Sequence, residues 1–300
     1  MTTALITGAA GFIGPHIVNE FLNRGWNVKG IDLVECDKFS NIKHNNYSFE
    51  RKDVRDLVVE DLIGVDYVVH LAFITNIPNS IANPLDTTRD NINMTTHLMD
   101  IATKAEIKKF LFPSTASQYG NNPIPWDETM TSDPIEPYSW QKLSCEFACK
   151  MWFSCYGLPT TIFRFFQVFG ENQRKDTAIS AFIRSKREGK PITLVETIAQ
   201  SSFRTGRRDF IYVKDLAEAV ALAAESDKTG MGEILNVGCG EATTMEDVAN
   251  AIGGDVTFIP RRKFEVEAHL ADISKIKGML GWKPKVSILD WVKIFSQRTE

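Results

Sequence analysis

The chain has 300 residues, of which 43% are hydrophobic and 24% charged, an ordinary globular composition with material for one large domain or two interlocked ones. Its formal net charge is −4 at pH 7, and without a basic footprint we expect neither nucleic acid nor an anionic membrane as a partner. No apolar stretch approaches the roughly 20 residues of a membrane span, and the first expected strand leaves no room for a signal peptide before it.

A glycine turn follows the first expected strand and opens a helix. Gly8 allows the tight strand-to-helix turn, Gly11 lets backbone N–H groups approach a pyrophosphate, and Gly14 lets the helix pack closely on the strand. The second expected strand ends in Asp32, eighteen residues after Gly14, which is the spacing of a carboxylate that binds a ribose diol. A glycine triplet alone is often an ordinary loop, but this context predicts a dinucleotide-binding site. Because Asp32 would repel a 2′-phosphate and no arginine follows it directly, the sequence favours NAD over NADP.

Apolar strand runs alternate with helical patterns through the first half of the chain, which predicts a parallel sheet with helical crossovers. Beyond Gly170 the elements become shorter, although residues 233–237 are apolar enough to rejoin the main sheet. We expect strands at 4–6, 27–32, 47–53, 65–72, 109–114 and 160–168, and helices at 83–104, 138–156, 178–187, 214–225, 243–252 and 272–280.

The predicted fold class is α/β, a Rossmann-type doubly wound parallel sheet with a smaller C-terminal substrate-binding lobe. The sheet domain would cover residues 1–168, with 209–238 returning to it, and the lobe would consist of 169–208 and 239–300. In open parallel sheets the ligand lies beyond the carboxyl ends of the strands, so the residues directly after strands are the candidates for chemistry.

The five cysteines include no CxxC pair. Cys145 and Cys149 lie one helical turn apart, but two further ligands are missing nearby, so we interpret them as small buried hydrophobic residues and expect no metal site. An odd number of cysteines suits free thiols in a reducing cytosol, and we expect a cytoplasmic protein.

Tyr138 and Lys142 lie four residues apart at the start of an expected helix and therefore on one face. An ammonium at ~4–6 Å contributes roughly 3–4 kcal/mol at an effective dielectric near 20, which could lower the tyrosine pKa from about 10 by ~2–3 units, toward the operating pH of a base. An isolated pair of this kind is more often an ordinary surface contact. Here the preceding strand ends in hydroxyl side chains, from Ser114 to Ser117, at the carboxyl edge of the sheet. The combination predicts a site for proton transfer.

In these motifs the chain resembles the extended short-chain dehydrogenases/reductases of the NAD-dependent epimerase/dehydratase family, over nearly its whole length. The matching segments are TGAAGFIG at 7–14, HLA at 70–72, STASQYG at 114–120, YSWQK at 138–142, RRDFIYVKD at 207–215, NVGCGE at 236–241 and ADISKIKGMLGWKPKV at 271–286. Their joint order and spacing make the resemblance specific. It implies NAD as the cofactor and a nucleotide sugar as the substrate.

The resemblance implies roles for individual residues. Tyr138 would be the acid/base, Lys142 would bind the nicotinamide ribose, and Thr115 would hydrogen-bond the reacting sugar hydroxyl, with Ser114 as the alternative. The cofactor contacts would be Gly8, Gly11, Phe12, Ile13, Gly14, Asp32 on the adenosine ribose, Asp53 and Val54 beside the adenine, Leu71, Ala72, Asn91, Tyr138 and Lys142.

The resemblance also implies a substrate site. Arg208 and Arg262 match arginines that grip the diphosphate, for which a planar fork of donors is well suited. Glu265 matches a carboxylate on the nucleotide ribose. Gln167 stands where the family usually has an asparagine, which puts the diphosphate contact at that position in question.

Two further positions bear on the choice of sugar, and one segment differs in length from the family. Arg174 lies just past the sixth expected strand, where similar uronate epimerases have an arginine on the sugar carboxylate; the alternative is a solvated loop charge beside Lys175. His269 matches a position where a small residue admits N-acetyl groups, so its bulk favours an unacetylated sugar. Residues 195–206 are longer than the family's usual turn, and the sequence assigns them no role.

The residues after Thr115 bear on the reaction. Family dehydratases carry acidic residues there, and eliminating water needs an acid and a base, which Ala116 and Ser117 cannot supply. The leading interpretation is an NAD-dependent nucleotide-sugar 4-epimerase acting on a UDP-hexose or UDP-hexuronate through a transient 4-keto sugar. The alternatives are a nucleotide-4-keto-sugar reductase or a dehydratase of the same family, and a non-catalytic NAD-binding scaffold.

We also expect a homodimer, because in similar proteins the helices matching 83–104 and 138–156 pair with their symmetry mates as a four-helix bundle. An apolar stripe recurs at helical spacing on the second of these helices. Core packing would explain such a stripe equally well. The residues of the stripe are Leu143, Phe147, Met151 and Cys155.

Overall fold

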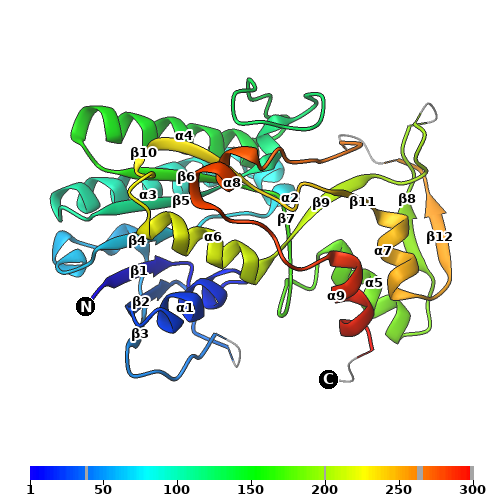
Figure 1. Ribbon diagram of the computed structural model, residues 1–300, viewed down its shortest axis with the longest axis horizontal. Coiled ribbons are helices and arrows are strands. Elements are labelled where there is room, and N and C mark those ends of the chain that lie inside the picture. Colours follow the sequence, from blue (N-terminus) through cyan, green and yellow to red (C-terminus); the bar gives the residue numbers. More distant parts are fainter. Residues whose placement is uncertain (38–39, 199–200, 262–265, 298–300) are drawn as a thin grey trace.

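The computed structural model describes residues 1–37, 40–198, 201–261 and 266–297. Its largest element is a seven-stranded parallel sheet (Figure 1). The strands are β1 (Thr3–Thr7), β2 (Asn27–Asp32), β3 (Tyr47–Arg51), β4 (Tyr67–His70), β5 (Lys109–Thr115), β6 (Thr160–Phe165) and β10 (Met231–Val237). Their order is β10-β6-β5-β4-β1-β2-β3, so the chain builds outward from β1 to β3 and then resumes on the other side of β1. This confirms the predicted doubly wound α/β fold.

Helices cover both faces of this sheet (Figure 1). They are α1 (Gly14–Asn23), α2 (Ile77–Ala82), α3 (Pro84–Lys104), α4 (Pro137–Tyr156), α6 (Val213–Glu225) and α8 (Ser274–Leu280), with the short 3-10 helices η1 (Val54–Asp56), η2 (Val59–Leu62) and η3 (Ala116–Tyr119) between strands. The pleat of β1 sends Ala4 and Ile6 into the core under α1 and α6, and Leu5 into the core under α3 and α4. Within the described ranges, no helix combines the length and the apolar character needed to cross a membrane.

A smaller body of structure lies beyond the carboxyl ends of the strands, at the right of Figure 1. It contains a three-stranded sheet of order β11-β9-β7 and a parallel pair, β12 and β8. The elements are β7 (Gln167–Phe169), α5 (Ala178–Arg187), β8 (Ile192–Val195), β9 (Arg207–Tyr212), β11 (Ala242–Thr244), α7 (Met245–Ile252), β12 (Val256–Ile259) and α9 (Ile288–Phe295). These elements share a core of their own.

Two features of the lobe differ from the sequence-based expectations. The single strand expected over 160–168 is broken at Phe166: β6 pairs within the large sheet, whereas β7 pairs with β9. Of the segment expected to return to the sheet, β10 does join it, but β9 pairs with β7 and β11 instead. The longer segment 195–206 folds back on itself, with Glu196 bridged to Thr205.

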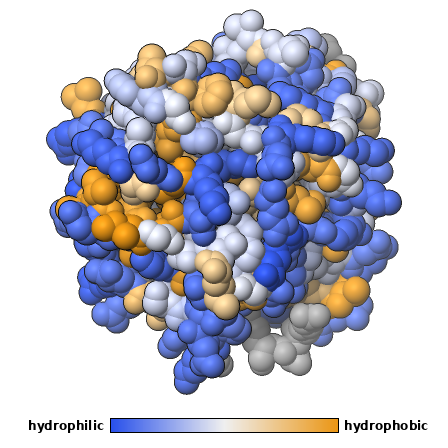
Figure 2. All heavy atoms as spheres, turned by 60° about the vertical axis from the view of Figure 1, so that its left-hand side comes forward, coloured by the Kyte–Doolittle hydropathy of each residue, from blue (hydrophilic) through white to orange (hydrophobic). Residues whose placement is uncertain are grey.

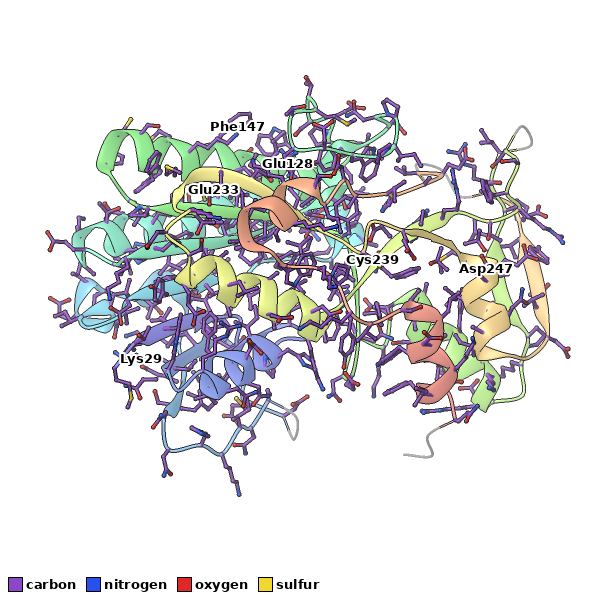
Figure 3. The ribbon with its side chains drawn as sticks, in the orientation of Figure 1. Lys29, Glu128, Phe147, Glu233, Cys239 and Asp247 are labelled. Carbon is purple, nitrogen blue, oxygen red and sulfur yellow. The ribbon has the colours of Figure 1, made fainter. Side chains whose placement is uncertain are left out.

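The outward face of α4 carries the apolar stripe noted in the sequence. Phe147 is 62% exposed and Met151 39% exposed, and Figure 3 shows Phe147 projecting away from the sheet. Packing within this chain's core therefore does not explain the stripe. Cys145 and Cys149 face the other way and lie in the core between α4 and the sheet, which confirms their interpretation as buried hydrophobic residues.

Candidate active site

The glycine turn between β1 and α1 lies against the loop that follows β4. Gly8 has a φ angle of +72°, and a Cβ atom there would lie 2.7 Å from the backbone nitrogen of Ala72. A Cβ atom at Gly14 would lie 2.8 Å from the Cα atom of Ala9, so α1 approaches β1 this closely only because position 14 has no side chain. Gly11 donates its own N–H to the carbonyl of Gly8 (3.2 Å). The first turn of α1 has no side-chain cap; because Pro15 has no N–H and His16 donates to the Ile13 carbonyl (3.1 Å), the backbone donors at this end come from Gly14 and the residue before it.

Phe12 and Ile13, between these glycines, are half-buried and pack against the apolar core of the lobe. Because these two side chains are packed against the lobe, they hold the start of α1 in place. A ligand on this side of the turn could contact only the backbone of Phe12 and Ile13. The glycine turn thus stands between the two bodies of the molecule.

Acidic residues follow β2 and β3 at the same edge of the sheet. Asp32 accepts a hydrogen bond from the N–H of Ala10 (2.9 Å), which ties the end of β2 to the glycine turn. Asp53 caps η1 and pairs with Arg55 (2.6 Å), and this hydrogen-bonded guanidinium lowers the pKa of the Asp53 carboxyl. Val54 is buried beside it.

The loop after β4 is fastened to the helices behind it. Leu71 and Ala72 run along the glycine turn, where they would meet a Cβ atom at position 8. Asn91 is fully buried and accepts from the N–H of Ile74 (2.7 Å). Its amide group donates to the carbonyl of Ile74 (3.2 Å) and to Gln141 (2.8 Å). Because both donors of Asn91 are engaged, we expect it to act on a cofactor through this loop rather than by direct contact.

The residues expected to carry the chemistry meet at the carboxyl edge of the sheet. Tyr138 and Lys142 occupy the first two turns of α4, and Thr115 ends β5. The Thr115 hydroxyl is close enough to Tyr138 to favour its ionised form, and it donates to the Ser117 hydroxyl (3.1 Å). The ammonium of Lys142 is buried and donates to the carbonyl of Pro113 (2.6 Å).

The protonation states in the structure differ from the sequence-based expectation. Burial raises the pKa of Tyr138 to about 12, and the hydrogen bond from Thr115 opposes it only in part. Burial also lowers the pKa of Lys142 to about 7. The predicted lowering of the Tyr138 pKa is therefore wrong for this arrangement, because the pairwise charge argument left out desolvation, which disfavours both charged forms.

A cavity of about 420 Å³ opens in the lobe, lined by residues of β7, α5, β8, β9 and α7. Gln167 and Arg208 both line it, as their expected substrate roles require. Gln173 lines it too, and its side-chain oxygen is buried without a hydrogen-bond partner. Since buried polar atoms are nearly always paired, this oxygen marks a place for a polar ligand group.

Arg174 reaches from the lobe to the loop after β4. Its guanidinium pairs with both carboxylate oxygens of Asp176 and donates to the Thr75 hydroxyl (3.1 Å). It is also close enough to favour the ionised form of Tyr138. Arg174 is therefore a bridging residue at the edge of the site and not an isolated solvated charge.

The His269 ring lies against that of Trp126, with 5.0 Å between the centroids and 39° between the planes, and burial lowers the pKa of His269 to about 3, helped by the charge of Arg208. It is thus a neutral, bulky wall residue. The expected diphosphate and ribose ligands Arg262 and Glu265 lie outside the described residues.

A sequence model of the NAD dependent epimerase/dehydratase family matches residues 4–238. The chain belongs to this family. A Bacillus subtilis relative named as an uncharacterized UDP-glucose epimerase, YtcB, is 31% identical and aligns over 95% of this chain and 94% of its own.

Two solved structures resemble this epimerase/dehydratase family member throughout. One is UDP-N-acetylglucosamine 4-epimerase from Methanobrevibacter ruminantium in complex with UDP-N-acetylmuramic acid, with a TM-score of 0.89, 31% identity, and coverage of 99% of this chain and 97% of that one. The other is UDP-glucuronic acid 4-epimerase from Bacillus cereus in complex with UDP-glucuronic acid and NAD, with a TM-score of 0.88, 29% identity, and coverage of 97% of both chains.

The cofactor of this family is NAD, as the sequence predicted. The residues of this chain fit it. Gly8 and Gly14 leave a close-packed turn without side chains, and the backbone N–H groups of Ile13 and Gly14 at the start of α1 are the donors suited to a pyrophosphate. Asp32 presents a carboxylate beside the turn, where a ribose diol can bind and a 2′-phosphate cannot.

Sequence reasoning missed a buried polar network behind the reacting groups. Arg164 and Glu146 form an ion pair (2.9 Å) whose side chains are 4% and 2% exposed. The amide of Gln118 donates to Glu146, to the Ser114 hydroxyl (3.1 Å) and to the carbonyl of Thr115 (3.2 Å). The network therefore holds the hydroxyl-bearing turn against α4. The signal was an arginine inside an apolar strand run, since a buried charge must have a partner.

A second missed group lies between the glycine turn and α3. His70 is buried, with Nδ1 2.8 Å from the Thr7 hydroxyl and Nε2 3.1 Å from the Thr95 hydroxyl. The Thr7 hydroxyl also accepts from the N–H of Ala72 (3.2 Å). The HLA motif was recognised in the sequence, but the distant hydroxyls that satisfy its histidine could not be named from spacing.

Proposed function

We propose that this chain is an NAD-dependent nucleotide-sugar 4-epimerase that acts on a UDP-hexose or UDP-hexuronate through a transient 4-keto sugar. The observation that carries the proposal is the grouping of Tyr138, Thr115 and Lys142 at the carboxyl edge of the sheet. The two similar structures, both named as UDP-sugar 4-epimerases, support the same reaction.

In this proposal Tyr138 takes the proton of the sugar 4-hydroxyl while Thr115 holds that hydroxyl by a hydrogen bond. NAD, when bound, supplies the hydride acceptor and donor and a positive charge near the tyrosine. Tyr138 later returns the proton to the same sugar oxygen, so no proton is consumed overall. Lys142 has three donors, of which the Pro113 carbonyl takes one; a ribose hydroxyl would have to share the others with the faces of the Phe73 and Phe112 rings. Because the Tyr138 pKa is about 12, ionisation depends on these nearby positive charges.

The alternatives fit the chain less well. A dehydratase needs an acid and a base at sugar C5 and C6, which Ala116 and Ser117 do not supply. A reductase that consumes NADPH would place a 2′-phosphate beside Asp32, whose carboxylate repels it. A non-catalytic scaffold has no need of the tyrosine, lysine and threonine together.

The test is incubation of the purified protein with a panel of UDP-, dTDP- and GDP-sugars, followed by NMR analysis of the products. We expect the 4-epimer of a UDP-sugar, no net change in NAD, and a transient NADH absorbance. Net consumption of a reduced cofactor, loss of water from the sugar, or no conversion of any sugar would overturn the proposal.

Within this proposal the preferred substrates are unacetylated, with UDP-glucuronate and UDP-galacturonate ahead of UDP-glucose and UDP-galactose. His269, whose ring is tilted against that of Trp126, would take the space that an N-acetyl group needs. Arg174 would bind the sugar carboxylate, and a bidentate pair of this kind is stronger than a neutral hydrogen bond. Asp176 competes for that guanidinium, so the carboxylate has to share it.

We further propose a homodimer formed through α3 and α4. The exposed stripe on α4, with Phe147 and Met151, supports this, because large apolar side chains at helical spacing suit an isologous helix interface. Figure 2 shows apolar side chains at several places on the surface, so exposure alone does not single out α4. The proposal rests on the helical spacing of the exposed apolar residues along α4. Light scattering at micromolar concentration should give twice the chain mass; a monomer mass would contradict it.

For the location of the protein we propose the cytoplasm. All five cysteines are free thiols, and Cys155 is exposed. Free thiols persist in a reducing compartment.

A further inference from the structure

The ammonium of Lys142 lies between two aromatic rings. Its Nζ atom is 3.7 Å from the ring centroid of Phe73 and 4.6 Å from that of Phe112, and it donates to the carbonyl of Pro113 (2.6 Å). The lysine side chain is only 3% exposed. A carbonyl and two ring faces therefore take over much of the solvation that water would give this cation.

Burial alone would discharge this lysine near neutral pH, since the desolvated ammonium has its pKa lowered to about 7. The titratable groups whose charges act on it, or on which it acts, are His70 from β4 and Cys145, Glu146 and Cys149 from α4 itself. The one carboxylate among them, Glu146, is bound by Arg164 (2.9 Å) and Gln118. The two ring faces therefore join the Pro113 carbonyl as direct contacts of the ammonium that favour its charged form.

Phe73 is the ring best placed to control this cation. It follows directly on the HLA motif, in the loop after β4, and its ring stands edge-on to that of Tyr138 with centroids 6.0 Å apart. The next residue, Ile74, is held by both its N–H and its carbonyl to the buried Asn91. Asn91 thus anchors the loop that carries Phe73, and the Phe73 ring contacts both Lys142 and Tyr138.

We propose that Phe73 is a positioning residue whose ring face keeps Lys142 charged and held at the carbonyl of Pro113. This rests on the proposed function, because a charged lysine matters for turnover only if Tyr138 exchanges a proton with the substrate. Phe73 touches neither reacting atom; it acts through Lys142. The contact also explains why a large aromatic side chain stands in a loop at the edge of the cofactor site.

The test is a direct titration of Lys142 in the NAD-loaded protein labelled with lysine carrying ¹³C at Cε, with Lys142→Arg used to assign its NMR signal. In Phe73→Leu, which keeps an apolar side chain but loses the ring face, we expect the Lys142 pKa to fall by about one pH unit. Phe73→Tyr, which restores a ring face, should return it to within a few tenths of wild type. Phe110→Leu is the matched control, since Phe110 is a buried ring on the same strand as Phe112 and faces His70 instead.

Turnover gives the second readout. Because the charged lysine is lost as pH rises through its pKa, the alkaline limb of the kcat profile should move to lower pH in Phe73→Leu, with KM nearly unchanged. An unchanged Lys142 pKa in Phe73→Leu, or an equal fall in Phe110→Leu, would overturn the proposal. The titration needs no substrate, so a wild-type protein that converts no sugar would sink the proposed function while leaving this test intact.

Discussion

The loops around the glycine turn and the cavity wall of the lobe hold their polar side chains in different ways. Around the glycine turn His70 is bonded to Thr7, and Asn91 to Ile74, in buried contacts. On the cavity wall Gln167 is exposed, and the buried side-chain oxygen of Gln173 has no hydrogen-bond partner among the described residues. A satisfied buried network fixes a geometry, whereas an open wall can adjust to a ligand. The difference suggests that the sheet holds the chemistry and the lobe selects the sugar.

The largest effect should come from the sheet edge. Tyr138→Phe removes only the ionisable oxygen, so kcat should fall by at least about 10²–10⁴-fold, the usual contribution of a general acid or base. The ring stays in place, so bound NAD, measured after denaturing the purified variant, should match wild type. More than a few per cent of residual activity would mean that another group exchanges the proton.

The buried ion pair should give the next largest effect. Glu146→Ala leaves Arg164 buried without its carboxylate, which should lower the free energy of unfolding by about 3–5 kcal/mol in urea denaturation. Glu146→Gln keeps the shape and an acceptor for Gln118, so its cost should be clearly smaller. Equal losses in the two variants would show that shape rather than charge pairing matters at this position.

Substitutions in the lobe should change the substrate specificity more than the stability of the protein. Arg174→Ala should lower kcat/KM for UDP-glucuronate roughly 10–100-fold, the worth of a hydrogen-bonded charge, and change UDP-glucose little. Asp176→Asn, which removes the competing carboxylate, should shift the preference further toward the acidic sugar. A loss of the same size for both sugars in Arg174→Ala would leave the carboxylate contact without support.

The smallest effects come from a matched pair of amides. Asn91→Leu strips the backbone of Ile74 of its partners and should cost about 1–3 kcal/mol in the free energy of unfolding. Gln173→Leu removes an oxygen that bonds to nothing in the protein, so its cost should stay within about 0.5 kcal/mol while KM for the nucleotide sugar rises. Thermal denaturation of both variants measures the two losses of stability. A larger loss of stability in Gln173→Leu than in Asn91→Leu would contradict the contrast between sheet and lobe.

Local sequence patterns predicted the elements well because strand and helix periods are read from neighbouring residues. The strand at 27–32 and the helix at 178–187 match β2 and α5 residue for residue. The helix expected from 243 starts later, at Met245, because Thr243 and Thr244 pair with β9 first and Thr244 then caps the helix. Such competition between a strand and a helix depends on a partner far away in the chain.

The parts of the site that the sequence did not predict all depend on distance or on solvent. The Arg164–Glu146 pair and the ring of Phe73 over Lys142 join residues with no fixed sequence spacing. The pKa of Tyr138 depends on how completely the site excludes water, which only the packed structure determines. The spacing of the motifs predicted that Tyr138 and Lys142 lie in one site. It did not predict the protonation states of their side chains.

The junction between the two bodies has a consequence for motion. Only Phe166 separates β6 from β7, and its N–H is bonded to Val237 (3.0 Å). β9 passes into α6 without a linker, and Asp209 accepts from the N–H groups of Gly240 (2.9 Å) and Ala271 (3.0 Å) where the chain crosses again. A hinge needs backbone that can change its dihedral angles freely, and these crossings offer little of it. We therefore expect the two bodies to move as one during turnover, with substrate entering by displacement of surface side chains rather than by domain opening.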